Sequence, residues 1–196
     1  MRKRDEDKQR RIKEALIEIV LKEGFGSASV AKIARRADVS PATVYVYYEN
    51  KEDMLRSVFA ETSRALYERL AQSVGTVSTG EAAVDALVRT YYAFMRDHVK
   101  EYSFIEQFAS CPHRACAYAD ANNVGPVMKV LDDLKSRGLL ADLDDLVLFG
   151  LLFNPVKALL AFSVSEDNAP DGMASEADSE RLLNEVIAAT QRAVAR

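Results

Sequence analysis

The chain has 196 residues, a net charge of −4, and hydrophobic and charged contents of 48% and 29%, which are ordinary values for a globular protein in water. That length is enough for one large domain or two small ones with a substantial core. The negative net charge by itself argues against a generic nucleic-acid binder. Only 8 Gly and 5 Pro are present, so helix is favoured through most of the chain.

Positive charge is concentrated towards the N-terminal end. Residues 1–56 hold 13 Lys and Arg against 10 Asp and Glu, so this part carries about +3 and the remainder about −7. A basic head on an acidic body suits a protein that meets phosphates only with its N-terminal end. A chance fluctuation would give the same numbers, so charge alone does not decide between the two.

Two cysteines, Cys111 and Cys116, do not make a disulfide framework, and we expect reduced thiols in a cytoplasmic protein. No apolar segment follows the charged N-terminus, so we expect no secretory signal. The longest apolar run, Leu146–Phe153, is too short to span a bilayer. We therefore expect no membrane association.

Apolar periodicity predicts a first helix from about Asp7 to Gly24, with Phe25 packing back onto it. Ser29 and Ser40 are placed to cap two short helices that follow. Pro41 would occupy the first position of the second of these, where its missing N–H costs nothing.

Between the two short helices, Ala37-Asp38-Val39 is long enough only for a turn, and Asp38 tolerates left-handed backbone angles. Val44 and Tyr48 lie at helical spacing and are predicted to face the core. Two helices around a tight turn form a helix-turn-helix.

The rest of the chain, from Lys51 onward, is predicted to be helical, and most of it forms the body of the protein. Asn50 is placed to cap a helix that runs without interruption from Lys51 to about Ser73, and Ser78 with Glu81 predicts a capping box for the next helix. Pro155 is expected to kink or break the helix that contains it. Further helices are predicted at Tyr102–Ser110, Val127–Arg137, Leu143–Ser165 and Glu176–Val194.

Several short motifs occur in fixed order near the N-terminus. They are Phe25, Ser29, Ile33-Ala34, Ala37-Asp38-Val39-Ser40, Tyr45-Val46-Tyr47-Tyr48 and Asn50-Lys51-Glu52-Asp53-Met54-Leu55. Together they resemble the TetR/AcrR family of bacterial helix-turn-helix transcriptional regulators, over roughly a quarter to a third of the chain. Asp38 stands where the family usually has Gly, and Tyr48 where Phe is more usual.

The resemblance implies an all-α dimer with a three-helix DNA-binding head, joined by a continuous helix to a variable helical bundle. It assigns residues 6–66 to the helix-turn-helix domain and 67–196 to a domain that dimerises and encloses a small-molecule site. The apolar surface of the last two helices, Leu143–Ser165 and Glu176–Val194, exceeds what one small bundle covers, so we expect them to form the homodimer.

The second helix of a helix-turn-helix enters the major groove of double-stranded DNA, here expected to be a palindromic operator. Ala42 and Val46 can pack on thymine methyl groups, and Thr43 can bond to base edges or phosphate. The tyrosine hydroxyls can hold phosphates, although core packing also explains tyrosines in this helix. The resemblance supports Thr43, Tyr45 and Lys51 as contacts. The predicted DNA-binding residues are Ser29, Ser40, Pro41, Ala42, Thr43, Tyr45, Val46, Tyr47 and Lys51.

Aromatic side chains with a few polar groups are typical of small-molecule sites, and they are equally typical of ordinary cores. The predicted ligand-binding residues of the body are Tyr91, Tyr92, Met95, Phe104, Gln107, Phe108, His113, Met128, Phe149, Phe153 and Asn154.

These features predict a dimeric repressor that a small, largely apolar effector releases from its operator. Ligand-promoted DNA binding is equally compatible with the sequence. An alternative is a DNA-binding protein whose body binds another protein. A third is an enzyme that uses Cys111 or Cys116 with His113. The two thiols also allow a redox-sensing pair, and with His113 a metal site, but structural zinc normally takes four ligands. We expect no catalytic site, metal or cofactor.

Overall fold

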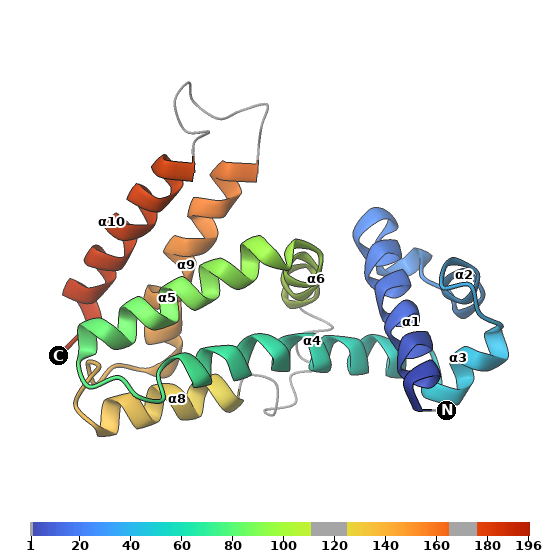
Figure 1. Cartoon of the computed structure of the whole chain (residues 1–196), viewed down its shortest axis with the longest axis horizontal. Coiled ribbons are helices and arrows are strands. Elements are labelled where there is room, and N and C mark those ends of the chain that lie inside the picture. Colours follow the sequence, from blue (N-terminus) through green and yellow to red (C-terminus); the bar gives the residue numbers. More distant parts are fainter. Residues whose placement is uncertain (1, 111–124, 165–175) are drawn as a thin grey trace. The chain divides into compact units, whose positions relative to one another are not determined.

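The computed structural model describes residues 2–110, 125–164 and 176–196 (Figure 1). Across these ranges the chain is helical, which confirms the predicted all-α class, and the only β pairing there is one isolated antiparallel bridge between Leu140 and Ala195. The elements are α1 (Arg2–Glu23), a 3₁₀ turn η1 (Phe25–Ser27), α2 (Val30–Arg36), α3 (Pro41–Tyr47), α4 (Lys51–Ser73), α5 (Gly80–Asp97), α6 (Val99–Ala109), α8 (Gly125–Ser136), α9 (Asp145–Val164) and α10 (Glu176–Val194).

The chain divides into two compact units. One combines the residues up to Ser63 with the segment that begins at His98, and the other combines Arg64–Asp97 with the C-terminal part of the chain. A single boundary after residue 66, as the sequence predicts, leaves α6 in the C-terminal domain. In the structure α6 packs on α1 and belongs to the N-terminal unit.

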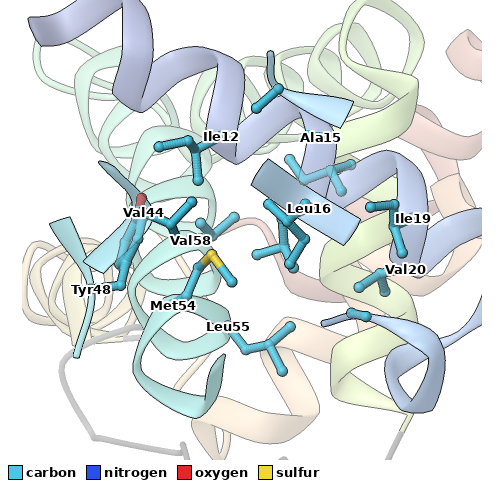
Figure 2. Packing of buried hydrophobic residues seen from close by; sticks show 14 of the residues in the cluster. Ile12, Ala15, Leu16, Ile19, Val20, Val44, Tyr48, Met54, Leu55 and Val58 are labelled. Carbon is cyan, nitrogen blue, oxygen red and sulfur yellow. The ribbon is translucent and has the colours of Figure 1, made fainter. Parts of the chain in front are cut away.

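The core of the N-terminal unit forms between α1 and the helices that follow it. Figure 2 shows Ile12 and Leu16 of α1 on the side of the α3 and α4 side chains, with Ile19 further along α1. All three are fully or almost fully buried, and each contributes about 1.5–3 kcal/mol by leaving water. Val44 and Tyr48 are buried in the same cluster, as predicted. α3 is therefore held on the core by one face only.

Side-chain caps fix where the short helices begin. The Lys32 N–H donates to Ser29 Oγ (3.3 Å) and the Thr43 N–H to Ser40 Oγ (3.1 Å), and Pro41 begins α3. At the start of α4 the Asp53 N–H donates to Asn50 Oδ1 (2.9 Å). All three predicted caps are confirmed, since each satisfies an N–H that the first helical turn leaves unpaired.

The turn between α2 and α3 depends on Asp38, which has φ 52° as predicted for a left-handed position. The Arg11 guanidinium of α1 donates to the Asp38 carbonyl oxygen (3.4 Å) and lies 3.6 Å from its carboxylate. This link holds the turn on α1 from the outside. It partly offsets the strain of a non-glycine residue in that conformation.

The starts of α1, α5 and α6 differ from the prediction. α1 begins at Arg2 and α6 at Val99, both earlier than the apolar pattern indicated. The cap of α5 is Thr79, whose Oγ1 accepts from the Ala82 N–H (3.2 Å), so the predicted Ser78 cap is wrong by one residue.

The sequence predicts a kink or a break at Pro155, and the break does not occur, because α9 continues through this residue. Pro155 and Leu151, whose carbonyl loses its donor, both lie on the exposed side of α9. Water can hydrate that carbonyl, which makes a proline tolerable at this position.

The C-terminal unit packs α5, α9 and α10 against one another, with α9 and α10 antiparallel neighbours (Figure 1). Leu87, Leu148, Leu152 and Phe153 are fully buried in it. Residues 194–196 pair with 139–141: the Ala141 N–H donates to the Val194 carbonyl (2.8 Å) and the Arg196 N–H to the Leu139 carbonyl (3.1 Å). Among the helices that the structure describes, none combines the length and apolar content needed to cross a membrane.

Candidate functional site

α3 presents an uncharged outer face. Tyr45 and Val46 are 58% and 77% exposed, and Pro41 and Ala42 are exposed beside them. Large apolar side chains seldom face water in this way without a partner, so a cluster of them on one short helix marks a binding surface. Tyr47 is half-buried and its ring meets that of Tyr48 (6.5 Å between centroids).

Hydroxyl groups at the start of α3 are bonded to each other. Ser40 Oγ and Thr43 Oγ1 lie 2.9 Å apart, while Ser40 also accepts from the Thr43 N–H. The Thr43 hydroxyl is thus held in place and keeps lone pairs for an outside donor. Ser40 acts first as the cap that orients the helix.

Lys51 is the first residue of α4 and is half-buried. Within the described ranges no ion pair joins it to an acidic side chain. A cation at a helix N-terminus is disfavoured by the helix dipole, and Glu52 and Asp53 in the same turn offset this. The position suits a lysine that meets an external anion.

Two of the three cations of α2 are tied to carboxylates of α1. Lys32 pairs with Glu23 and Arg36 with Glu18, while Arg35 is exposed and has no ion-pair partner in the parts of the chain that the structure describes. Ser29 serves as the cap of this helix. These pairs fix α2, and through the turn α3, against α1.

The predicted ligand-binding residues fall into two groups. In the C-terminal unit, Tyr91 of α5 lies 4.6 Å from Phe153 of α9, and Phe149 lies 4.9 Å from Phe153, measured between ring centroids. Tyr92 and Met95 are buried on α5. Met128 is half-buried on α8, and Asn154 is on the exposed side of α9.

The other group lies in the N-terminal unit. Phe104 and Phe108 of α6 are fully buried in the core cluster of the N-terminal unit, which contains the DNA-binding head. The Phe108 ring stacks on that of Phe59 of α4 (4.2 Å between centroids) and meets that of Phe25 edge-on (5.5 Å). Gln107 Oε1 is buried and no described residue bonds to it. Phe104 and Phe108 are thus packing residues of the head. Their spacing of four was a signal that both face one neighbour.

Sequence reasoning missed a carboxylate with two cationic partners. Glu18 of α1 accepts from Arg36 of α2 and from Lys100 of α6 (2.9 Å). Lys100 is 82 residues away in sequence, so no local pattern could indicate the pair. His113, Cys111 and Cys116 lie outside the described residues. Elsewhere in the described chain no three metal-binding side chains come together.

Residues 12–58 match the sequence profile of the bacterial regulatory proteins of the tetR family. The chain is 29% identical over 97 residues to a fatty acid metabolism regulator protein of Bacillus subtilis, and the match covers 49% of this chain and 50% of that protein. The chain therefore spans about half the length of that relative.

Solved structures extend the likeness over the whole chain. A TetR family transcription regulator from Marinobacter aquaeolei VT8 has a TM-score of 0.78 and 25% identity, and the alignment covers 100% of this chain and 99% of that one. The transcriptional regulator FadR from Bacillus subtilis, in complex with stearoyl-CoA, has a TM-score of 0.68 and 21% identity over 92% and 96% of the two chains, which shows a shared fold.

These proteins are regulators, not enzymes, in agreement with the prediction that the chain is no enzyme. The matched profile lies on the capped helix-turn-helix and its supporting helices, and the fold is shared from end to end. Residues 12–58 therefore match the tetR family of bacterial regulatory proteins, and the chain as a whole shares the fold of a TetR family transcription regulator.

Proposed function

We propose that this chain is a homodimeric transcriptional repressor that binds a palindromic operator with its N-terminal unit. A small, largely apolar ligand of the C-terminal unit releases it. The observation that carries the DNA-binding part is the exposed, uncharged face of α3 on a helix that is fixed by its cap and its buried side.

On this proposal α3 enters the major groove with Ala42 and Val46 against thymine methyl groups and Thr43 at a base edge or phosphate. Tyr45, at 58% exposure, can reach a phosphate oxygen with its hydroxyl. Lys51 meets a further phosphate. Specificity then comes from methyl contacts and DNA shape more than from charged base readout.

The dimer would form on α9. Leu146, Val147 and Leu151 of α9 are 74%, 49% and 38% exposed. Leu143, just before the helix, is 37% exposed, so large apolar side chains face water at the start of α9. A second copy of the chain would cover them about a two-fold axis. Two α3 helices related by that axis require two half-sites of opposite orientation in the operator.

The ligand class is proposed from the C-terminal unit and from the relatives. Tyr91, Phe149 and Phe153 form an aromatic group without a charged side chain among them, which suits an apolar molecule. The relatives include a fatty acid metabolism regulator and a regulator in complex with stearoyl-CoA. A long acyl chain is therefore the part of the ligand that this group would hold, and a long-chain acyl-CoA, whose head is charged, is the first candidate that carries one.

The proposed mechanism is a population shift. Ligand would favour a state of the C-terminal units in which the two α3 helices no longer match successive major grooves, roughly 34–36 Å apart on B-DNA. α4 can carry the change because it is one uninterrupted helix of both units.

The DNA-binding part is tested by selecting duplexes from a random pool with the full chain and mapping the protected bases. We expect a palindrome with a preference for A·T pairs where Val46 meets thymine. Val46→Ala should relax the preference at that position in both half-sites. Recovery of no common sequence would overturn the proposal, and so would an asymmetric site that Val46→Ala leaves unchanged.

A further inference from the structure

Glu18 joins three helices of the N-terminal unit. Its carboxylate, on α1, accepts hydrogen bonds from Arg36 of α2 and from Lys100 of α6. The Glu18 side chain is 21% exposed, whereas those of Arg36 and Lys100 are 55% and 65% exposed. The half-buried carboxylate is therefore the fixed member, and two mobile cations converge on it.

Arg36 and Lys100 each lie at one end of a helix. Arg36 is the last residue of α2, directly before the turn that sets the direction of α3. Lys100 is in the first turn of α6. One carboxylate thus connects the end of the first helix of the DNA-binding motif to the start of α6.

The same side of α6 is also held by aromatic contacts. Lys100, Phe104 and Phe108 are spaced by four residues and therefore share one face of the helix. Phe108 stacks on Phe59 of α4, and both phenylalanines contact Phe25. α6 is fixed to the head at both of its ends, by charge at the first and by rings at the second.

A single residue separates α6 from the C-terminal unit along the chain. α5 ends at Asp97 and α6 begins at Val99, and the division between the two units falls between Asp97 and His98. His98 has φ −127° and ψ 50° and makes no side-chain cap for α6. A change in α5 therefore reaches α6 through one backbone joint.

We infer that Glu18 is a positioning residue that transmits the state of α6 to α2, and so to the DNA-contacting helix, by a route separate from α4. Movement of α6 withdraws Lys100 from Glu18, and the carboxylate, no longer held by Lys100, then positions Arg36 beside the turn less firmly. This inference concerns the regulation of the proposed DNA site and rests in that respect on the proposed function.

The first test needs neither DNA nor ligand. Hydrogen exchange is measured in the full chain for the Ala37 and Val39 amides, which bond to the carbonyls of Ile33 and Ala34. Lys100→Met should raise their exchange rates by about two- to five-fold, the range expected from loss of one exposed ion pair. Glu101→Gln, on the next residue of α6 and not bonded to Glu18, should leave both rates unchanged.

Unchanged rates in Lys100→Met would overturn the inference. An equal rise at all amides of the N-terminal unit would do the same, because it would mean general destabilisation and no directed link. Since the experiment uses the free protein, its result stands even if stearoyl-CoA proves not to be a ligand.

The second test uses the selected duplex and stearoyl-CoA as the probe. The ratio of duplex Kd with and without saturating stearoyl-CoA measures the coupling between the two sites. Glu18→Gln and Lys100→Met should lower that ratio by about two- to five-fold, the worth of one such ion pair. Glu23→Gln breaks the other α1–α2 pair, which does not involve α6, and should leave the ratio unchanged.

An equal loss in Glu23→Gln would show that the pairs only stabilise α2 and would overturn the inference. A wild-type chain with no response to stearoyl-CoA would count against the proposed ligand, while the exchange experiment would still decide the role of Glu18.

Discussion

The residues that would contact DNA bases are uncharged, and the neighbouring arginines hold the helices of the motif in position. On α3, Tyr45 and Val46 project into solvent while Val44 and Tyr48 are buried, so the helix has a clear inner and outer side. Around it, Arg11 holds the turn and Arg36 holds the end of α2. Lys51, like Arg35, has no acidic partner among the described residues, and its place at the start of α4, soon after α3 in the chain, makes it the proposed phosphate contact.

Lys51→Ala should weaken binding to every duplex sequence. Loss of one phosphate contact should flatten the slope of log K against log salt concentration by about one unit. Fluorescence anisotropy at several salt concentrations measures this. Lys129→Ala, an exposed lysine of the C-terminal unit, is the matched control. A change in sequence preference with an unaltered slope would contradict the phosphate role.

Glu18 should make stability depend on pH. Hydrogen bonding from Lys100 lowers the pKa of Glu18 below its ordinary value of 4.5, burial opposes this, and Arg36 adds to the lowering. Because the folded pKa is below the unfolded one, the ion pairs contribute fully above about pH 4.5 and are lost as the pH falls through the folded pKa.

This pH dependence is measured by urea unfolding of the wild type and Glu18→Gln between about pH 6 and pH 3, the range in which a carboxylate of lowered pKa titrates. The wild type should be the more stable protein at the upper end, and the difference should vanish at the lower end. A difference that stays constant with pH would show that the charge of Glu18 is not responsible.

At the scale of elements, the start of α5 is tightly enclosed by backbone from the end of the chain and from the segment before α9. A Cβ added to Gly80 would lie 2.2 Å from the Leu139 carbonyl oxygen and 2.7 Å from both the backbone nitrogen and the carbonyl oxygen of Arg196. These backbone atoms belong to the pairing of residues 139–141 with 194–196. Residue 80, at the start of α5, must therefore be glycine, because the paired backbone of residues 139–141 and 194–196 leaves no room for a Cβ.

Gly80→Ala should destabilise the protein by about 1–3 kcal/mol, the usual cost of overpacking, or more, because backbone atoms cannot move aside cheaply. Gly75→Ala is the control, since its Cβ would meet only the Gln72 carbonyl oxygen at 3.6 Å. Urea unfolding followed by circular dichroism compares the two. Equal midpoints for both variants would contradict the close approach.

The elements that sequence predicted well are those decided locally. The caps at Ser29, Ser40 and Asn50 and the left-handed Asp38 each depend on residues within four positions. The place of α6 depends on Phe25, Phe59 and Glu18, which are far from it in sequence. Local sequence could therefore not indicate that its aromatic residues, Phe104 and Phe108, pack in the core of the N-terminal unit.

At the scale of the whole molecule, the proposed function requires two copies of the chain. In a single copy of the chain, Leu146 and Val147 of α9 are exposed to solvent. We propose that the second copy covers them. A two-fold pair of heads then gains avidity on a palindrome that a single head lacks.

Leu146→Glu should give a monomer, because a charge at the centre of an apolar interface is costly to bury. Operator affinity should fall by about 100-fold or more with the loss of bivalent binding. Sedimentation velocity and anisotropy measure the two effects. Val99→Glu, at a 52% exposed apolar residue outside α9, should remain dimeric. A dimeric Leu146→Glu protein would place the interface elsewhere.

The most direct test of the account is a titration of the complex between the full chain and its selected duplex with stearoyl-CoA, followed by anisotropy of the labelled DNA. Stearate and free coenzyme A serve as tail-only and head-only controls. We predict that stearoyl-CoA lowers the anisotropy to that of free DNA, and that coenzyme A alone does not. An unchanged or increased anisotropy, at stearoyl-CoA concentrations that calorimetry shows to saturate the protein, would contradict a repressor released by its ligand.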